Sequence, residues 1–95
     1  MPGVLAYLVA WPGEDDEQSI PIYDHLYVGR ECSGIEEDRR FLVDDDAVSR
    51  NHMEVRLDVE QDQAWLVDRS TNGTRLNGTR IERSVPVQIM LSTVT

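Results

Sequence analysis

The stretch "MEVRLDVEQDQAWLVD", residues 53–68, predicts two strands and the turn between them. At positions 53 to 59 apolar residues alternate strictly with charged residues, which is the period of a strand with one buried face and one solvated face. The segment "AWLVD" is almost continuously apolar and predicts a central strand. The polar "EQDQ" at 60–63 is typical of a hairpin connection. A sheet is therefore expected to organise the fold.

Short segments of the same kind recur along the chain, and no stretch of about a dozen residues keeps a helical period. Asn77-Gly78 lies between two of them and is typical of a tight hairpin turn. Many short strands in a small chain indicate an all-β fold, a β-sandwich of two antiparallel sheets. The predicted strands are residues 4–11, 19–22, 26–29, 41–43, 53–59, 64–67, 75–76 and 89–91.

The charge balance restricts the partners. The 95 residues suit one domain, and their 18 acidic against nine basic residues give a net charge of −9. Such a surface repels polyanions, because duplex binding depends on neutralising several phosphates. Neither nucleic acid nor a membrane surface is expected as a partner.

The cysteine content bears on the compartment and on metals. Cys32 is the single cysteine, so the chain has no internal disulfide and no cysteine cluster for a metal. The apolar run at 4–11 has no basic segment before it and is too short to span a membrane. We therefore expect a cytoplasmic protein without metal or cofactor.

Ser49 and His52 lie close together in "VSRNH", residues 48–52, and raise the question of serine catalysis. A serine nucleophile needs a base that is oriented by a third group, together with an oxyanion hole. No glycine elbow of the hydrolase type surrounds Ser49. The sequence therefore favours a binding protein over an enzyme.

Three segments together carry a specific resemblance. "YVGR" (27–30), "VSRNH" (48–52) and "DRSTNGTRLNG" (68–78) occur in the order and at the spacings of the forkhead-associated (FHA) domain, which the chain resembles from about residue 4 to 95. The resemblance implies a sandwich of about eleven short strands. It also implies that loops at one end bind phosphothreonine on protein partners, in kinase-dependent signalling.

The resemblance also implies the binding residues. Phosphothreonine brings about −1.5 to −2 charges and three acceptor oxygens, which a planar guanidinium and hydroxyl groups can bind. Arg30 and Ser49 are expected to grip the phosphate, and Arg50 and Thr71 to add contacts. Asn72 is expected to hold the peptide main chain.

Other residues are expected to support the site. By the same resemblance, His52 is a buried histidine that braces the loop bearing Ser49, and Gly29 and Gly73 serve the backbone geometry. The aspartates at 44–46 are expected at the rim, where they influence which peptides approach.

An alternative is a phosphate-independent interaction or dimerisation module on the same fold. Arg30, Ser49 and Asn72 argue against it, because such a module has no need of them.

The C-terminal part departs from the family. The family usually has a Gly-Asp turn before its penultimate strand, and "PVQIML" at 86–91 has neither residue. The chain also ends where the final strand would begin. We therefore expect residues 1–95 to form a single FHA-like domain, the N-terminal module of a longer protein. With its final strand truncated, the first strand would keep an open edge prone to self-association.

Overall fold

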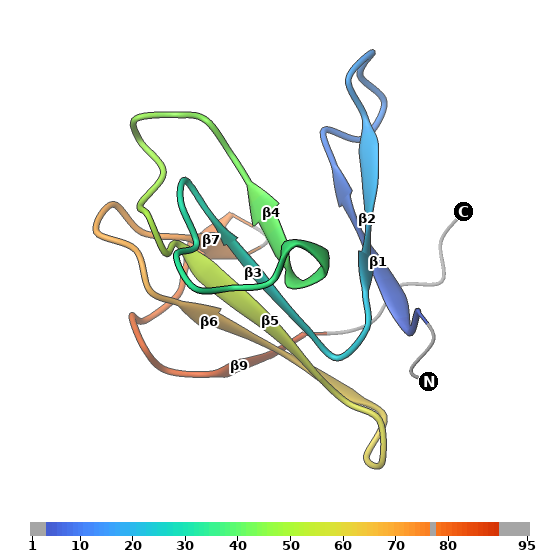
Figure 1. Cartoon of the computed structure of the whole chain (residues 1–95). Helices are drawn as coiled ribbons and strands as arrows, with labels where there is room; N and C mark the ends of the chain where they lie inside the picture. Colours follow the sequence, from blue (N-terminus) through green and yellow to red (C-terminus); the bar gives the residue numbers. More distant parts are fainter. Residues whose placement is uncertain (1–3, 77, 90–95) are drawn as a thin grey trace.

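The computed structural model describes residues 4–76 and 78–89, which form nine strands in three hydrogen-bonded sheets (Figure 1). A short 3₁₀ helix, η1, is also present, and the described residues contain no helix long and apolar enough to cross a membrane. The elements are β1 (Ala6–Ala10), β2 (Gln18–Ile22), β3 (His25–Gly29), η1 (Glu37–Arg39), β4 (Arg40–Leu42), β5 (Met53–Asp58), β6 (Gln63–Asp68), β7 (Arg75–Leu76), β8 (Thr79–Arg80) and β9 (Val87–Ile89).

The main sheet has the order β4-β3-β5-β6-β9, with β5 antiparallel to both of its neighbours. Val55 on β5 lies opposite Leu26 on β3 and Leu66 on β6, and all three side chains are buried. Because alternate residues of a strand face opposite sides, this row fixes the inner face of the sheet. The predicted period of β5 and the central place of β6 are thus confirmed.

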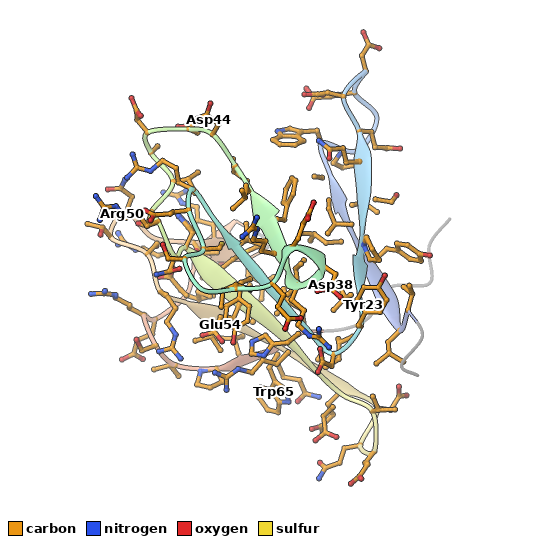
Figure 2. The ribbon with its side chains drawn as sticks, viewed as in Figure 1. Tyr23, Asp38, Asp44, Arg50, Glu54 and Trp65 are labelled. Carbon is orange, nitrogen blue, oxygen red and sulfur yellow. The ribbon has the colours of Figure 1, made fainter. Side chains whose placement is uncertain are left out.

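The outer face of the sheet carries Glu54 and Trp65, which point away from the β1–β2 hairpin (Figure 2). The alternation of residues 53–59 predicts a solvated Glu54, but this residue is only 7% exposed. That expectation was wrong, because side chains of His25, Arg56 and Arg69 surround the carboxylate and donate hydrogen bonds to it.

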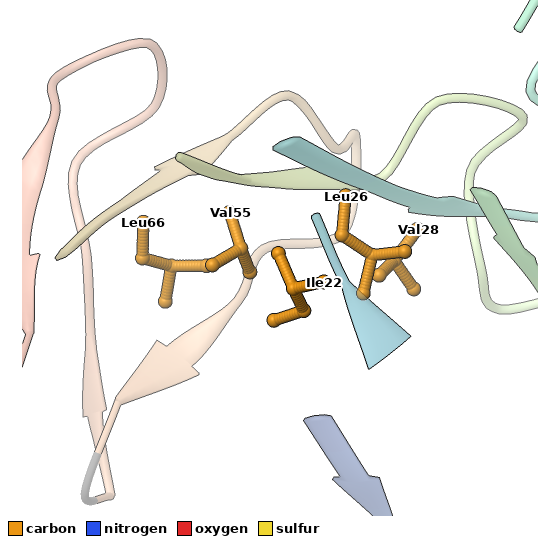
Figure 3. Close-up of a cluster of buried hydrophobic side chains, with 5 residues drawn as sticks. All are labelled: Ile22, Leu26, Val28, Val55 and Leu66. Atoms are coloured by element: carbon orange, nitrogen blue, oxygen red, sulfur yellow. The ribbon is translucent and has the colours of Figure 1, made fainter. Parts of the chain in front are cut away.

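The β1–β2 and β7–β8 hairpins cover the inner face of the main sheet and complete the sandwich. Ile22, from β2, packs among Leu26, Val28, Val55 and Leu66 (Figure 3). Both hairpins add partly buried apolar side chains around this cluster, so the core lies between the hairpins and the main sheet. These side chains are Ala6, Leu8 and Ile20 from β1–β2 and Leu76 and Ile81 from the β7–β8 region.

The pairing of β3 with β4 is parallel, with Tyr27 opposite Arg40. The expectation of purely antiparallel sheets was therefore wrong for this pair. Residues 30–39, which include η1, carry the chain back along the sheet before β4 begins. A connection of this length allows a parallel return, whereas a tight turn would impose an antiparallel one.

The strands number nine in the described residues, compared with about eleven expected. β7 and β8 form the hairpin expected around Asn77-Gly78, although β8 itself was not predicted because two residues show no period. β9 begins at Val87, which pairs with Leu66, and not at residue 89. Residues 90–91 of the predicted last strand, and the truncated strand expected near residue 95, lie outside the described residues.

Candidate functional site

Three loops meet at one end of the main sheet, on the left in Figure 1. Met53, the first residue of β5, lies opposite Val28 near the end of β3 and Asp68 at the end of β6. The antiparallel pairing therefore brings the segments after β3, before β5 and after β6 to the same edge. Arg50 and Asp44 extend from the middle loop at this end (Figure 2).

An open pocket of about 430 Å³ lies among these loops. It brings together side chains from three segments that are distant in the sequence. The predicted residues that line it are Arg30, Ser49, Arg50, Thr71 and Asn72. Asp46, Val48, Asn51 and Arg69 complete the lining.

Backbone hydrogen bonds hold the first two loops together. The amide of Arg30 donates to the Ser49 carbonyl at 2.9 Å, and the amides of residues 31–32 both donate to the Arg50 carbonyl at 3.1 and 3.0 Å. A Cβ atom on Gly29 would lie 2.9 Å from the Arg50 carbonyl carbon and closer still to its oxygen. The close approach of the two loops therefore requires glycine at position 29.

His52 lies under the pocket, half-buried, and bridges two loops. Its Nδ1 accepts a hydrogen bond from the Ser49 amide at 3.1 Å. Since an amide can only donate, Nδ1 is unprotonated and Nε2–H donates to the Gly73 carbonyl, also at 3.1 Å. Gly73 has φ +100, in the left-handed region that favours glycine. One imidazole thus ties the loop of Ser49 to the loop of Asn72.

The polar groups of the pocket keep hydrogen-bonding capacity for a ligand. The Ser49 hydroxyl oxygen accepts from the Thr71 amide at 2.9 Å, which leaves its O–H able to donate outwards. Asn72 Nδ2 donates to the Ala47 carbonyl at 2.9 Å. Its side-chain oxygen and second N–H remain suited to a peptide backbone.

A buried carboxylate, which the sequence reasoning missed, shapes the third loop. Asp68 is 2% exposed, and its Oδ1 accepts from the Ser70 amide, the Ser70 hydroxyl and the Thr74 hydroxyl. Burial alone would raise the pKa of Asp68, but the hydrogen bonds outweigh it and hold the pKa below its usual value. The Ser70 hydroxyl oxygen also accepts from the Gly73 amide at 2.7 Å. The available signal was an aspartate two residues before a serine at a strand end.

Two pocket arginines have loose acidic neighbours. Arg30 Nη1 lies 4.0 Å from Asp46 Oδ1, and Arg50 Nε lies 3.5 Å from Glu31 Oε2. Exposed ion pairs of this kind contribute little, so both guanidinium groups can rearrange around an anion. Of the three aspartates at 44–46, Asp46 lines the pocket, whereas Asp45 Oδ1 accepts a hydrogen bond from the Ala47 amide within the loop.

The FHA domain family model matches residues 26–92, which contain all three loops of the pocket. The chain belongs to the FHA domain family. The "GR", "SRNH" and "TNG" segments that line or support the pocket of this FHA domain all lie within the matched range.

Two solved structures resemble the chain in fold. The crystal structure of the MEK1 FHA domain in complex with a HOP1 phosphothreonine peptide has a TM-score of 0.64 and 24% identity, covering 77% of this chain and 74% of that chain. The crystal structure of the MEK1 FHA domain alone has a TM-score of 0.67 and 24% identity, covering 88% of this chain and 72% of that chain. A comparison with curated proteins finds no match.

Proposed function

We propose that this FHA domain binds protein partners that are phosphorylated on threonine, and that its pocket receives the phosphothreonine. The observation that carries the proposal is the convergence of Arg30, Ser49 and Thr71 on one open pocket, with the Ser49 hydroxyl oriented by the Thr71 amide. The phosphothreonine peptide bound to the similar MEK1 FHA domain supports the same ligand class.

The chemistry of the pocket suits a phosphate dianion. Arg30 and Arg50 supply charged guanidinium N–H donors, and the Ser49 hydroxyl supplies an uncharged O–H donor. Asn72 lines the same pocket, and we infer that its side-chain amide binds the peptide backbone. These are contacts of recognition, and the proposed function includes no catalytic step and no cofactor.

The positions of Ser49 and His52 also favour binding over catalysis. His52 Nδ1 accepts from the backbone amide of Ser49 and not from its hydroxyl. The imidazole therefore supports the loop and is not oriented as a general base for the serine.

We place the domain in the cytoplasm, as part of kinase-dependent signalling. Cys32 is unpaired and fully buried, and burial raises the pKa of its thiol. A structural thiol of this kind is compatible with a reducing compartment.

Phosphothreonine is expected to bind more tightly than phosphoserine. Val48 is the apolar side chain in the pocket lining and is available to contact the γ-methyl group of the ligand. One extra carbon in an enclosing site contributes roughly 1–3 kcal/mol. Equal affinities for a matched phosphothreonine and phosphoserine pair would contradict this preference.

The deciding experiment is a titration of matched peptides, with and without phosphate on threonine. Arg30→Ala should weaken binding of the phosphorylated peptide by roughly 2–5 kcal/mol, because a charge partner of the phosphate is lost. Arg75→Ala, on the exposed start of β7 and outside the pocket, is the matched control and should bind like the parent. Parent-like binding by Arg30→Ala would show that the site is wrongly placed.

A second candidate function is phosphate-independent self-association through β1. Tyr7 and Val9 alternate on the outward side of β1 and are 61% and 46% exposed. Concentration-dependent association in sedimentation, together with no effect of phosphate on peptide binding, would favour this candidate over the first.

A further inference from the structure

Arg69 is a third arginine in the pocket, and the function proposed above leaves it without a role. It follows β6 directly, and its backbone amide donates to the His52 carbonyl at 2.8 Å. Its main chain is therefore fixed to the loop that carries the phosphate-binding groups.

Arg69 and Arg30 reach the pocket from different faces of the sheet. Arg69 continues the outer-face series of Trp65 and Val67, whereas Arg30 follows the inner-face residue Val28 by two positions. Strand β5 lies between β3 and β6, the strands that these two residues follow, so the two strands are separated by two strand spacings, about 10 Å. Arg69 is thus placed to contact a part of the ligand other than the group that Arg30 grips.

The side chain of Arg69 is held by Glu54. Arg69 Nε donates to Glu54 Oε2 at 2.8 Å, and Glu54 Oε1 accepts from His25 Nε2 at 2.9 Å and from Arg56 Nη2 at 3.2 Å. Burial alone would raise the pKa of Glu54, but these hydrogen bonds outweigh it and lower the pKa. One carboxylate therefore faces two guanidinium groups, and the cluster keeps a net positive charge.

The terminal nitrogens of Arg69 are available to a ligand. Within residues 4–76 and 78–89, its side chain donates a hydrogen bond only through Nε. The side chain is 40% exposed, compared with 74% for Arg50, whose acidic neighbour is also exposed. Glu54 already orients the guanidinium plane of Arg69. Binding an oxyanion at its Nη1–Nη2 edge would therefore cost less side-chain conformational entropy than binding one at Arg50.

We propose that Arg69, positioned by Glu54, is a second anion-binding group that contacts an acidic residue flanking the phosphothreonine. The shared ligand chemistry is an oxyanion, either a carboxylate or a second phosphate. This inference rests on the proposed function. Asp46 lies beside Arg30 and repels an acidic peptide residue on that side of the pocket. The preference for an acidic residue is therefore restricted to the peptide positions that lie near Arg69.

The test uses phosphothreonine peptides with alanine flanks, into which aspartate is introduced at one flanking position at a time. Fluorescence anisotropy gives the affinities of the parent, Arg69→Gln and Arg56→Gln. Arg56→Gln is the matched control, because it removes the same charge and another Glu54 contact, yet Arg56 lies outside the pocket. Phosphoserine in place of the favourable aspartate then distinguishes the two oxyanion sources.

In the parent, aspartate at one flanking position should tighten binding about fivefold, as a partly exposed ion pair allows. Arg69→Gln should remove this gain, so that it binds the aspartate-flanked and alanine-flanked peptides with equal affinity, whereas Arg56→Gln should keep the gain. Glu54→Asp keeps the charge but shortens the side chain. It should lower the ratio of the affinity for the aspartate-flanked peptide to that for the alanine-flanked peptide, without weakening binding of the alanine-flanked peptide.

Three results would overturn the inference while leaving the proposed function in place. The first is that aspartate tightens binding at no flanking position. The second is that Arg69→Gln weakens binding of the aspartate-flanked and alanine-flanked peptides by the same factor. The third is that Arg56→Gln loses the gain from aspartate as fully as Arg69→Gln does. An unchanged ratio in Glu54→Asp would overturn the positioning role of Glu54. If the parent bound none of the phosphothreonine peptides, the proposed function itself would fall as well.

Discussion

The backbone amide of Ser49 donates a hydrogen bond to Nδ1 of His52 at 3.1 Å, so a side chain beneath the pocket sets the position of the serine. The opposite ring nitrogen donates to the Gly73 carbonyl, also at 3.1 Å. A single imidazole therefore connects two of the three loops that are expected to contact the phosphothreonine.

His52→Ala should lower both stability and affinity for phosphothreonine peptides. The substitution leaves the Ser49 amide and the Gly73 carbonyl without their partner, and an unsatisfied polar group costs about 1–3 kcal/mol. Thermal melts and peptide titrations measure the two effects. Ser49→Ala is the comparison, because it should weaken binding with a smaller loss of stability. A His52→Ala variant that melts with the parent would contradict this role.

Gly29→Ala should disrupt the contact between the first two loops. The added Cβ would meet the Arg50 carbonyl, which accepts the amides of residues 31–32. The backbone must shift to relieve this clash, so we expect a lower melting temperature together with weaker peptide binding. Retention of both properties would show that the loops tolerate a wider separation.

The domain should lose stability in acid through Asp68 and Glu54. Hydrogen bonds hold the pKa of each carboxyl below its usual value despite burial. Their stabilising contribution is therefore fully present above the unfolded-state pKa of about 4 and is lost as pH falls through the lower folded-state pKa. Melts from pH 7 to 2 should show this decline, and Asp68→Asn should make it shallower. An identical acid profile for Asp68→Asn would contradict the linkage.

Peptides with a basic residue near the phosphothreonine should associate faster than neutral ones. Asp46 is fully exposed at the pocket and the net charge of −9 adds a long-range attraction for cations. Stopped-flow rates at low salt should show a difference that shrinks as salt is added. Asp46→Asn should reduce this difference in association rate more than Asp44→Asn does, because Asp44 does not line the pocket. Equal rates for basic and neutral peptides at low salt would count against steering.

The domain should self-associate through β1. Within the described residues β1 pairs only with β2, and Tyr7 and Val9 expose apolar surface beside that edge. Sedimentation at several concentrations should show association that Val9→Lys removes. Val59→Lys, at an exposed apolar residue outside the strands, is the control and should associate like the parent. A parent that stays monomeric at every concentration would show that this surface does not dimerise.

Local pattern was sufficient for the strands that carry the core. The period of two in residues 53–59 placed Val55 inside, and the Asn-Gly turn placed a hairpin between Arg75 and Arg80. Turn chemistry and side-chain alternation act over a few residues, so a single segment contains the information. The grouping of Arg30, Ser49 and Asn72 had a different source, because no single segment contains it. It was implied by the resemblance of three segments, taken together, to the FHA family.

Tertiary structure alone decided the parallel pairing of β3 with β4, the burial of Glu54 and the presence of Arg69 in the pocket. Glu54 has the position of a solvated residue in its own strand, and it is buried only because partners from β3, β5 and the end of β6 converge on it. Such convergence depends on strand order and register, which are set by packing between segments distant in the sequence. The alternation within one strand tells which face a side chain takes, but not what lies on that face.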